Sequence, residues 1–307
     1  MRGCFPVMNG GDGVILSKRG DVCYGWEVEL PPAFRCNEER YDAIVQALFS
    51  AVILLPDYTV VHKQDVYMKK KYVAEKSDGL LQEAYERHFD GREYLDHRCR
   101  LFLIFSSKKN VRGASSGLLG ISAGGSMPKA EALARYAAMA EQFATVVQGC
   151  GLLEMRRLTE DDIFGAGDFP GLIQDYLNFT DEGEDVLSDI QMRRDRVRTG
   201  DRYIGCHLIA DLDQLPAEVA SCRKVTSLST DSSAVNLSFL NEIGQELDCE
   251  HIVNHFILKE PQKDIHGELD TRRRQMLSMS ARSAENRMYS EELNEFLEET
   301  ATEQMHT

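Results

Sequence analysis

The sequence has no long apolar segment and no ordered set of cysteines. No apolar run reaches the roughly 18 residues that a bilayer-spanning helix needs. The opening, MRGCFPVMNGGDG, contains no apolar core of signal-peptide length. The eight cysteines are scattered, with no close pairs. This distribution favours reduced, buried thiols over a disulfide framework, and together these absences predict a cytoplasmic protein.

The sequence has fewer basic than acidic residues. Lys and Arg number 35 against 50 Asp and Glu, which gives a net charge of −15. Such a balance disfavours a broad nucleic-acid-binding surface and makes direct DNA contact an unfavoured interpretation. Two local basic clusters remain, one of Arg193, Arg194, Arg196 and Arg198 and one of Arg272, Arg273 and Arg274. Acidic neighbours favour solvated or protein-docking faces for both clusters, and a DNA-binding regulator stays an alternative.

A phosphate-binding loop of the form GxxxxGK[ST] is also missing from the sequence. The nearest string, GGSMPK at residues 124–129, lacks the final Gly-Lys-Ser/Thr. Pro128 also removes an N–H donor where amides would cradle phosphate. We therefore expect no nucleotide cofactor and no ATPase activity from this chain.

Histidines supply the remaining candidates for chemistry. Cys249, His251 and His255 have zinc-ligand types, but their neighbours favour a strand, which would place the two rings roughly 13 Å apart. Three further histidines lie near acidic residues and could form acid/base pairs: His62, His88 and His97 with Asp57, Asp65, Asp90 and Asp96. No nucleophile stands in a recognisable context such as GxSxG. We assign no catalytic, cofactor or metal residue, and a metal- or His/Asp-dependent enzyme remains an alternative.

Periodicity predicts an α+β fold with mostly antiparallel sheets and packed amphipathic helices. A hairpin is expected at residues 14–17 and 22–30, followed by a helix from the N-cap Asn37 to about Leu54. Residues 69–79 are expected to be a loop or helix start. Further helices are expected at 80–89, 126–148, 159–163, 169–179 and 184–196, and further strands at 58–61, 100–106, 152–158, 203–210, 235–240 and 249–258.

These elements suggest four parts. Residues 1–13 would be a flexible arm, 14–158 a first α+β lobe, 159–260 a second α+β lobe, and 261–307 a helical connector. The last part is strongly charged, with a narrow apolar strip that suggests weak docking or a missing partner.

Several blocks of sequence, in one order, carry a family resemblance. The first two are LLPDYTVVHKQDVY at residues 54–67 and YERHFDGREYLDHRCRLFLIF at 85–105. They are followed by QFATVVQGCGLLEMRRLTEDDIF at 142–164 and GDRYIGCHLIADLDQLP at 200–216. In amino-acid sequence and in order, these blocks resemble the amino-terminal region of the TraG-type conjugation ATPases of Bacteroides conjugative transposons. Those proteins are relatives of type IV secretion assembly ATPases.

The resemblance covers most of residues 14–258 and implies a scaffold region that precedes a RecA-like ATPase domain. The Walker motifs belong to that later domain, so no catalytic residue carries over. It also implies that this chain is a truncated or split protein. The implied partners are subunits of a conjugation channel, the chain's own ATPase domain and further copies of itself. The implied location is the cytoplasm, peripheral to the inner membrane through partner proteins.

Overall fold

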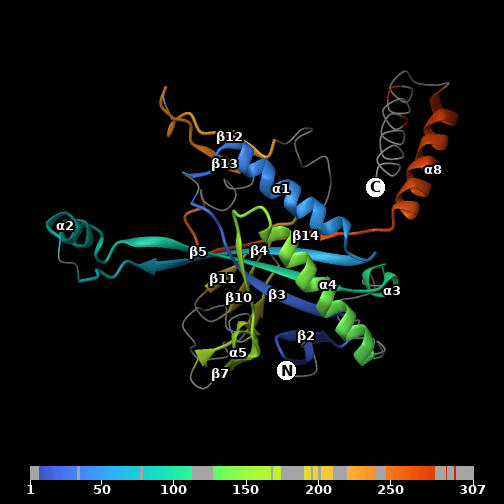
Figure 1. Cartoon of the computed structure of the whole chain (residues 1–307), viewed down its shortest axis with the longest axis horizontal. Coiled ribbons are helices and arrows are strands. Elements are labelled where there is room, and N and C mark those ends of the chain that lie inside the picture. Colours follow the sequence, from blue (N-terminus) through green and yellow to red (C-terminus); the bar gives the residue numbers. More distant parts are fainter. Residues whose placement is uncertain are drawn as a thin grey trace.

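The computed structural model describes residues 7–32, 35–76, 79–112, 127–166, 169–173, 190–194, 196–199, 202–209, 220–231, 233–238, 247–280, 288 and 294. Its centre is a seven-stranded sheet covered on one face by two long helices (Figure 1). Six strands follow the order β1-β2-β3-β5-β4-β14. β2 pairs with the first half of β3 and β6 pairs with its second half. Every pairing is antiparallel, so the predicted α+β class with mostly antiparallel sheets is confirmed.

Two hairpins build most of this sheet. The first contains β2 (Val14–Ser17) and β3 (Val22–Glu29), close to the expected bounds, and β1 (Val7–Gly11) pairs with β2. β1 was not expected, because it lies in residues 1–13, which the sequence suggested to be a flexible arm. The second joins β4 (Thr59–Lys71) to β5 (Glu93–Phe105). β6 (Glu154–Arg157) and β14 (His251–Leu258) complete the sheet. Every second residue of β3 is buried, from Val22 through Tyr24 and Trp26 to Val28, as expected for a sheet with one packed face.

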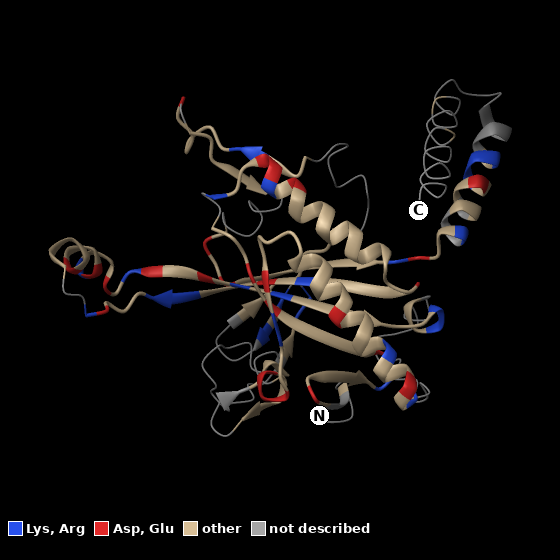
Figure 2. Cartoon of the chain, viewed as in Figure 1, with Lys and Arg blue, Asp and Glu red and all other residues tan. Residues whose placement is uncertain are grey.

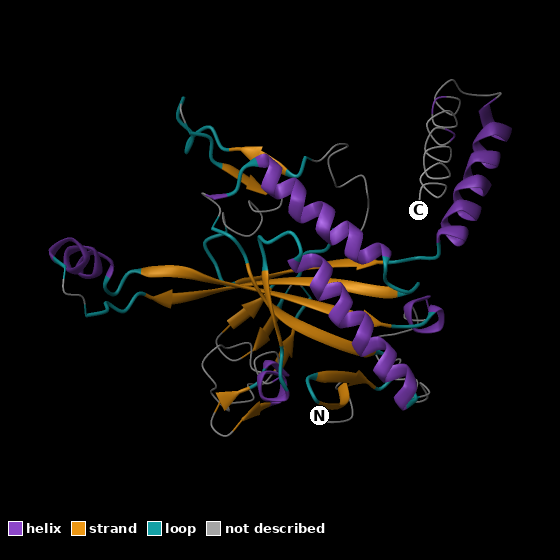
Figure 3. Ribbon diagram, viewed as in Figure 1, coloured by secondary structure: helices purple, strands orange, loops and turns teal. Residues whose placement is uncertain are grey.

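Helices α1 (Glu38–Ile53) and α4 (Ala130–Gln148) lie on the same face of the sheet (Figure 3). Asn37 caps α1 as predicted, because its side chain accepts a hydrogen bond from the Arg40 amide at 3.2 Å. The core between helices and sheet contains Trp26 against Phe143, with ring centroids 6.2 Å apart, and Phe105 stacked on Tyr136. Each large side chain buried there contributes about 1.5–3 kcal/mol.

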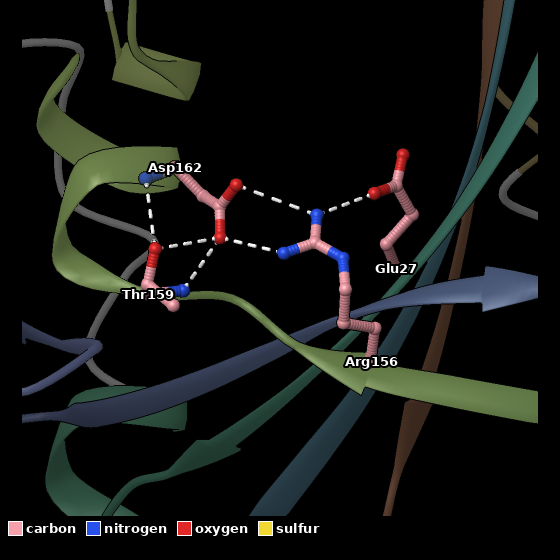
Figure 4. Close-up of polar contacts among 4 residues, drawn as sticks. All are labelled: Glu27, Arg156, Thr159 and Asp162. Atoms are coloured by element: carbon pink, nitrogen blue, oxygen red, sulfur yellow. Dashed lines mark hydrogen bonds and ion pairs between the residues drawn. The ribbon is translucent and has the colours of Figure 1, made fainter. Parts of the chain in front are cut away.

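The opposite face of the sheet holds a smaller apolar cluster of Phe102, Leu158, Ile163 and Leu172. Ile163 belongs to the short helix α5 (Glu160–Phe164), close to the helix expected at residues 159–163, and Thr159 is its N-cap. Thr159 accepts from the Asp162 amide at 3.3 Å, and the Thr159 amide donates to Asp162 at 2.8 Å. Arg156 joins Asp162 at 2.8 Å to Glu27 of β3 at 2.6 Å, so α5 is tied to the sheet (Figure 4).

The remaining elements are short or lie outside this sheet. They are α2 (Leu80–Phe89), α3 (Lys108–Arg112), α8 (Gln262–Ser280), β7 (Gly165–Ala166), β8 (Phe169–Pro170), β9 (Ile190–Met192), β10 (Val197–Thr199), β11 (Arg202–Ile204), β12 (Cys222–Lys224) and β13 (Asn236–Ser238). Of the helix predicted at 169–179, residues 169–170 form a strand while residues 172–173 are helical, and the helix predicted at 184–196 is wrong at residues 190–192. Residues 169–170 pair with β7, and residues 190–192 pair with β10. Next to the first strand, Gly171 passes so close to the backbone of residues 163–165 that an added Cβ would lie 2.2 Å from the Gly165 amide nitrogen.

The large sheet crosses the boundary that the sequence suggested between two lobes. β14 comes from the predicted second lobe, residues 159–260, yet it pairs along its whole length with β4, from His251 opposite Tyr67 to Leu258 opposite Val60. The predicted division at residue 158 therefore does not separate this strand from the first lobe. The predicted connector begins as a helix, α8, which extends away from the sheet (Figure 1).

Candidate protein-interaction site

A two-stranded arm projects from the sheet and has α2 at its tip (Figures 1 and 3). β4 and β5 pair over their full lengths, but β14 accompanies β4 only as far as Tyr67, and β3 accompanies β5 only from Cys99. The outer residues, Met68–Lys71 on β4 and Glu93–Asp96 on β5, pair only with each other among the described strands. Residues 69–71 were expected to be loop or helix start, and that prediction is wrong.

Charges on the two strands stabilise this arm. Lys70 of β4 contacts Asp96 of β5 at 2.7 Å, and Arg98 lies 3.6 Å from the same carboxylate. Figure 2 shows the basic end of β4 beside the acidic residues of β5. Because both faces of the arm meet solvent, its strands lack the apolar alternation that would have predicted them from the sequence.

Specific contacts hold the tip of the arm together. The buried carboxylate of Glu86, on α2, accepts from the Tyr72 hydroxyl at 2.7 Å and from the Glu75 amide at 2.9 Å. The hydrogen bond to Glu86 raises the pKa of Tyr72 to about 12. The rings of Tyr85 and Phe89 lie 4.6 Å apart, and Arg92 lies over Phe89 at 5.5 Å. Polar and aromatic contacts therefore hold the segment that enters the tip against α2.

Large apolar side chains on this tip point into solvent. Leu80 is 84% exposed, Leu81 87%, Val73 77% and Tyr85 56%. Leu81 and Tyr85 are four residues apart and share one side of the helix. Neighbouring exposed apolar groups on a projecting element are typical of a surface that binds another protein. The sequence predicted this helix with its correct bounds but not its exposure, because nothing in it shows that the flanking strands leave the sheet.

The root of the arm is a stack of rings across three strands. Tyr67 of β4 lies between His97 of β5 and His251 of β14, with centroids 4.5 Å apart on each side and interplanar angles of 11° and 14°. Two residues earlier, Asp65 accepts from the His97 Nε2 at 2.9 Å and also contacts the Lys63 ammonium. These contacts join the three strands at the point where the arm leaves the sheet.

Asp65 is the most strongly perturbed acid of this root. Burial alone would raise the pKa of Asp65, but the hydrogen bond from His97 and the charge of Lys63 outweigh it and lower the pKa to about 2. The carboxylate therefore stays charged at neutral pH. Burial, with the nearby charge of Lys63, lowers the pKa of His255. Asp65 is therefore an ionised side chain that joins β4 to β5 through His97.

The three histidines predicted as acid/base candidates have separate environments. Only His97 meets one of the predicted carboxylates, that of Asp65. His62 contacts the Asn254 amide oxygen at 2.8 Å and stacks between Phe102 and Phe256, and burial lowers its pKa. His88 packs edge-on against Phe89 on α2. Tyr67 was not found from the sequence because strand pairing alone brings it to His97, and Lys63 was not singled out although it contacts Asp65 on the same strand.

The predicted zinc-ligand types do not converge. His251 and His255 lie on β14, as the strand assignment required, and the His251 Nδ1 bonds to the Cys249 backbone oxygen at 2.7 Å. His251 faces Tyr67, whereas His255 is opposite Lys63. Within the described ranges, no three His, Cys, Asp or Glu side chains are grouped so that they could hold a metal ion.

Part of each basic cluster is engaged within the chain. Arg196 and Arg198 lie over the Tyr203 ring at 5.5 and 5.8 Å. On α8, Arg273 and Arg274 each contact Asp270 at 2.6 Å. Of the glycine-rich string, residues 124–126 lie outside the described residues, and Lys129 is the N-cap residue of α4.

No helix in the described part of the chain is both long and apolar enough to cross a membrane. Comparison of the sequence with protein-family models and with curated proteins gives no match.

Proposed function

We propose that this chain is the amino-terminal scaffold region of a TraG-type conjugation ATPase, which docks the motor onto a secretion channel during conjugative DNA transfer. The observation that carries the proposal is the arm, with Leu80, Leu81 and Tyr85 exposed at its tip. A few residues carry most of the binding energy of a protein interface, and Tyr is one of the residue types enriched among them. The ordered resemblance of residues 54–67 and 85–105 supports the family, and these blocks include most of β4, part of α2 and β5.

In this role the sheet is a platform and the arm is the contact element. The anchored root at Asp65, His97 and Tyr67 keeps the arm in a fixed direction, which lowers the entropy that docking would cost. The chain would act in the cytoplasm, peripheral to the inner membrane through its channel partners. α8 would lead toward the ATPase domain, and the chain itself would neither bind nor hydrolyse ATP.

The test is a mating assay with a conjugative element that encodes this protein. We expect the double substitution Leu81→Ser with Tyr85→Ser to lower DNA transfer by roughly tenfold or more, since both side chains would lie in the docking contact. A photoreactive residue at position 81 should crosslink to a channel subunit encoded by the same element. The matched control is Met192→Ser with Leu208→Ser, which removes apolar side chains that are 75% and 79% exposed elsewhere.

Unchanged transfer by the arm variant, with normal protein level, would refute docking through the tip. Crosslinks from position 81 that reach only this chain would do the same. For the nucleotide, isothermal titration of the purified chain with ATP should give no heat of binding. Micromolar affinity would contradict the scaffold role.

A further inference from the structure

β14 lies at one end of the large sheet with an edge that no described strand covers. Within the described part of the chain only β4 pairs with β14, along its other side. The eight residues HIVNHFIL contain no Lys, Arg, Asp, Glu or Pro, which are the residues that usually protect an edge from pairing. Three of its apolar side chains are exposed, Ile252 at 41%, Phe256 at 65% and Ile257 at 44%. This edge is therefore suited to accept another strand.

A second apolar surface lies beside this edge, on α1. Val45, Phe49 and Ile53 are 49%, 57% and 46% exposed and recur every fourth residue. Each follows a residue that packs on the core, Ile44, Leu48 or Val52, so the stripe lies roughly 100° around the helix from the buried face. We call Val45, Phe49 and Ile53 the α1 stripe.

The positions of the helices place the α1 stripe near β14. α4 lies over β3 and β5, as Phe143 against Trp26 and Tyr136 against Phe105 show. α1 packs beside α4, and its end lies at the end of β14, because Lys259 contacts the backbone oxygens of Ile53 and Leu55. α1 therefore stands between α4 and the free edge of the sheet. A strand added to β14 would therefore lie beside the α1 stripe.

We propose that a second copy of this chain occupies this surface, with its own β14 antiparallel to the first, so that one sheet continues across a two-fold axis. A two-fold interface uses the same patch twice and must be self-complementary. In antiparallel pairing about an axis normal to the sheet, only residues of the same face can lie opposite each other. With Asn254 on the axis, Ile252 of one copy lies opposite Phe256 of the partner subunit, and the reverse pair forms symmetrically.

This register covers the exposed groups on both faces of the strand. Ile252 and Phe256 cover each other on the face that carries His62 and Phe102. On the helix face, the two α1 stripes approach from opposite sides of the axis and cover Ile257. No charged side chain of β14 opposes a like charge, since the strand has none. The inference rests on the proposed scaffold role, in which copies of the chain assemble, and it assigns the contact between them.

The test is sedimentation equilibrium of the full chain, with a charge-pair design that reports the register. We expect wild type to be dimeric at about 100 µM, a concentration at which a dissociation constant of about 1 µM gives mostly dimer. Ile252→Lys with Phe256→Lys places like charges opposite each other and should raise the dimer dissociation constant by roughly tenfold or more. Ile252→Lys with Phe256→Glu places opposite charges in register and should retain the dimer. It also matches the first variant in the number and positions of its substitutions.

Phe49→Asp should weaken the dimer as well, whereas Leu81→Asp at the arm tip should leave it unchanged. A monomeric wild-type chain would overturn the proposal, and so would a dimer that the two-lysine variant leaves intact. Equal weakening by the Lys/Lys and Lys/Glu variants would overturn the register. Because the mating assay uses arm variants, a failed docking proposal and a failed dimer proposal give different results.

Discussion

At the scale of single residues, Asp65 makes the largest identifiable electrostatic contribution to the root of the arm. Its pKa in the folded protein is about 2, below the ordinary value of 3.8. A depressed pKa stabilises the fold above the unfolded pKa, and this stabilisation is lost as pH falls from about 4 to about 2. Because the side chain is only 10% exposed, we expect a contribution on the order of 2 kcal/mol at neutral pH.

Asp65→Asn should remove this contribution and flatten the acid end of the stability profile. Urea unfolding followed by fluorescence measures it directly, since Trp26 is the single tryptophan and is 1% exposed in the core. The control is Asp96→Asn, whose carboxylate is 29% exposed in the arm and should cost about 1 kcal/mol or less. Equal losses of unfolding free energy in the two variants would show that Asp65 contributes no more than an exposed carboxylate of the arm.

Thr159 is the second residue with a separable effect. Its hydroxyl and amide form the two bonds of the capping box with Asp162 (Figure 4). Thr159→Ala should lower the free energy of unfolding by about 1 kcal/mol. Thr145→Ala on α4 is the matched control, because that exposed hydroxyl only bonds to Glu141 one turn earlier, and its loss should be near neutral. A smaller loss for Thr159 than for Thr145 would contradict the capping role.

At the scale of elements, the arm tip should open independently of the sheet. Glu86→Ala removes both hydrogen bonds that hold Tyr72 and Glu75 against α2. We expect faster hydrogen exchange of the amides at 72–75, while the urea midpoint of the whole chain changes little, because few core contacts depend on this tip. Glu83→Ala, which breaks only an exposed pair with Arg87, is the control and should leave that exchange unchanged.

Local signals predicted several elements well. Asn37 marked the start of α1, and the helices expected at residues 159–163 and 80–89 correspond closely to α5 and fully to α2. In each case a cap or a bounded periodic run acts over a few residues, so the sequence carries it directly. The outer part of β4 was missed because Lys69, Lys70 and Lys71 give no period of two. The strand there is held by its partner β5 and by ion pairs rather than by a buried face.

The sequence did not predict which distant strands pair with each other. Residues 249–258 were recognised as a β-leaning run, but nothing in them indicated β4 as the partner, almost 200 positions earlier. Antiparallel pairing depends on the shape and burial of both strands together, and many strands fit equally well. The stack of His97, Tyr67 and His251 was unpredictable for the same reason, since it exists only once three strands are in register.

At the scale of the whole molecule, a net charge of −15 per chain opposes the proposed dimer, because two like-charged copies repel each other over their entire surfaces. Salt screens this repulsion, with a Debye length that falls from about 14 Å at 0.05 M to about 4 Å at 0.5 M. The contact through β14 and the α1 stripe is mostly apolar and contains no ion pair for salt to weaken. Association should therefore tighten as salt is raised.

A chain that acted by gripping DNA through Arg193, Arg194, Arg272 and Arg273 would behave in the opposite way, since displaced counterions make such binding weaker in salt. Sedimentation equilibrium at low and high salt and a duplex-binding titration over the same range separate the two behaviours. We expect dimers favoured by salt and no salt-sensitive duplex binding. A dimer that dissociates in salt would mean that charged groups, not the neutral edge of β14, join the two copies.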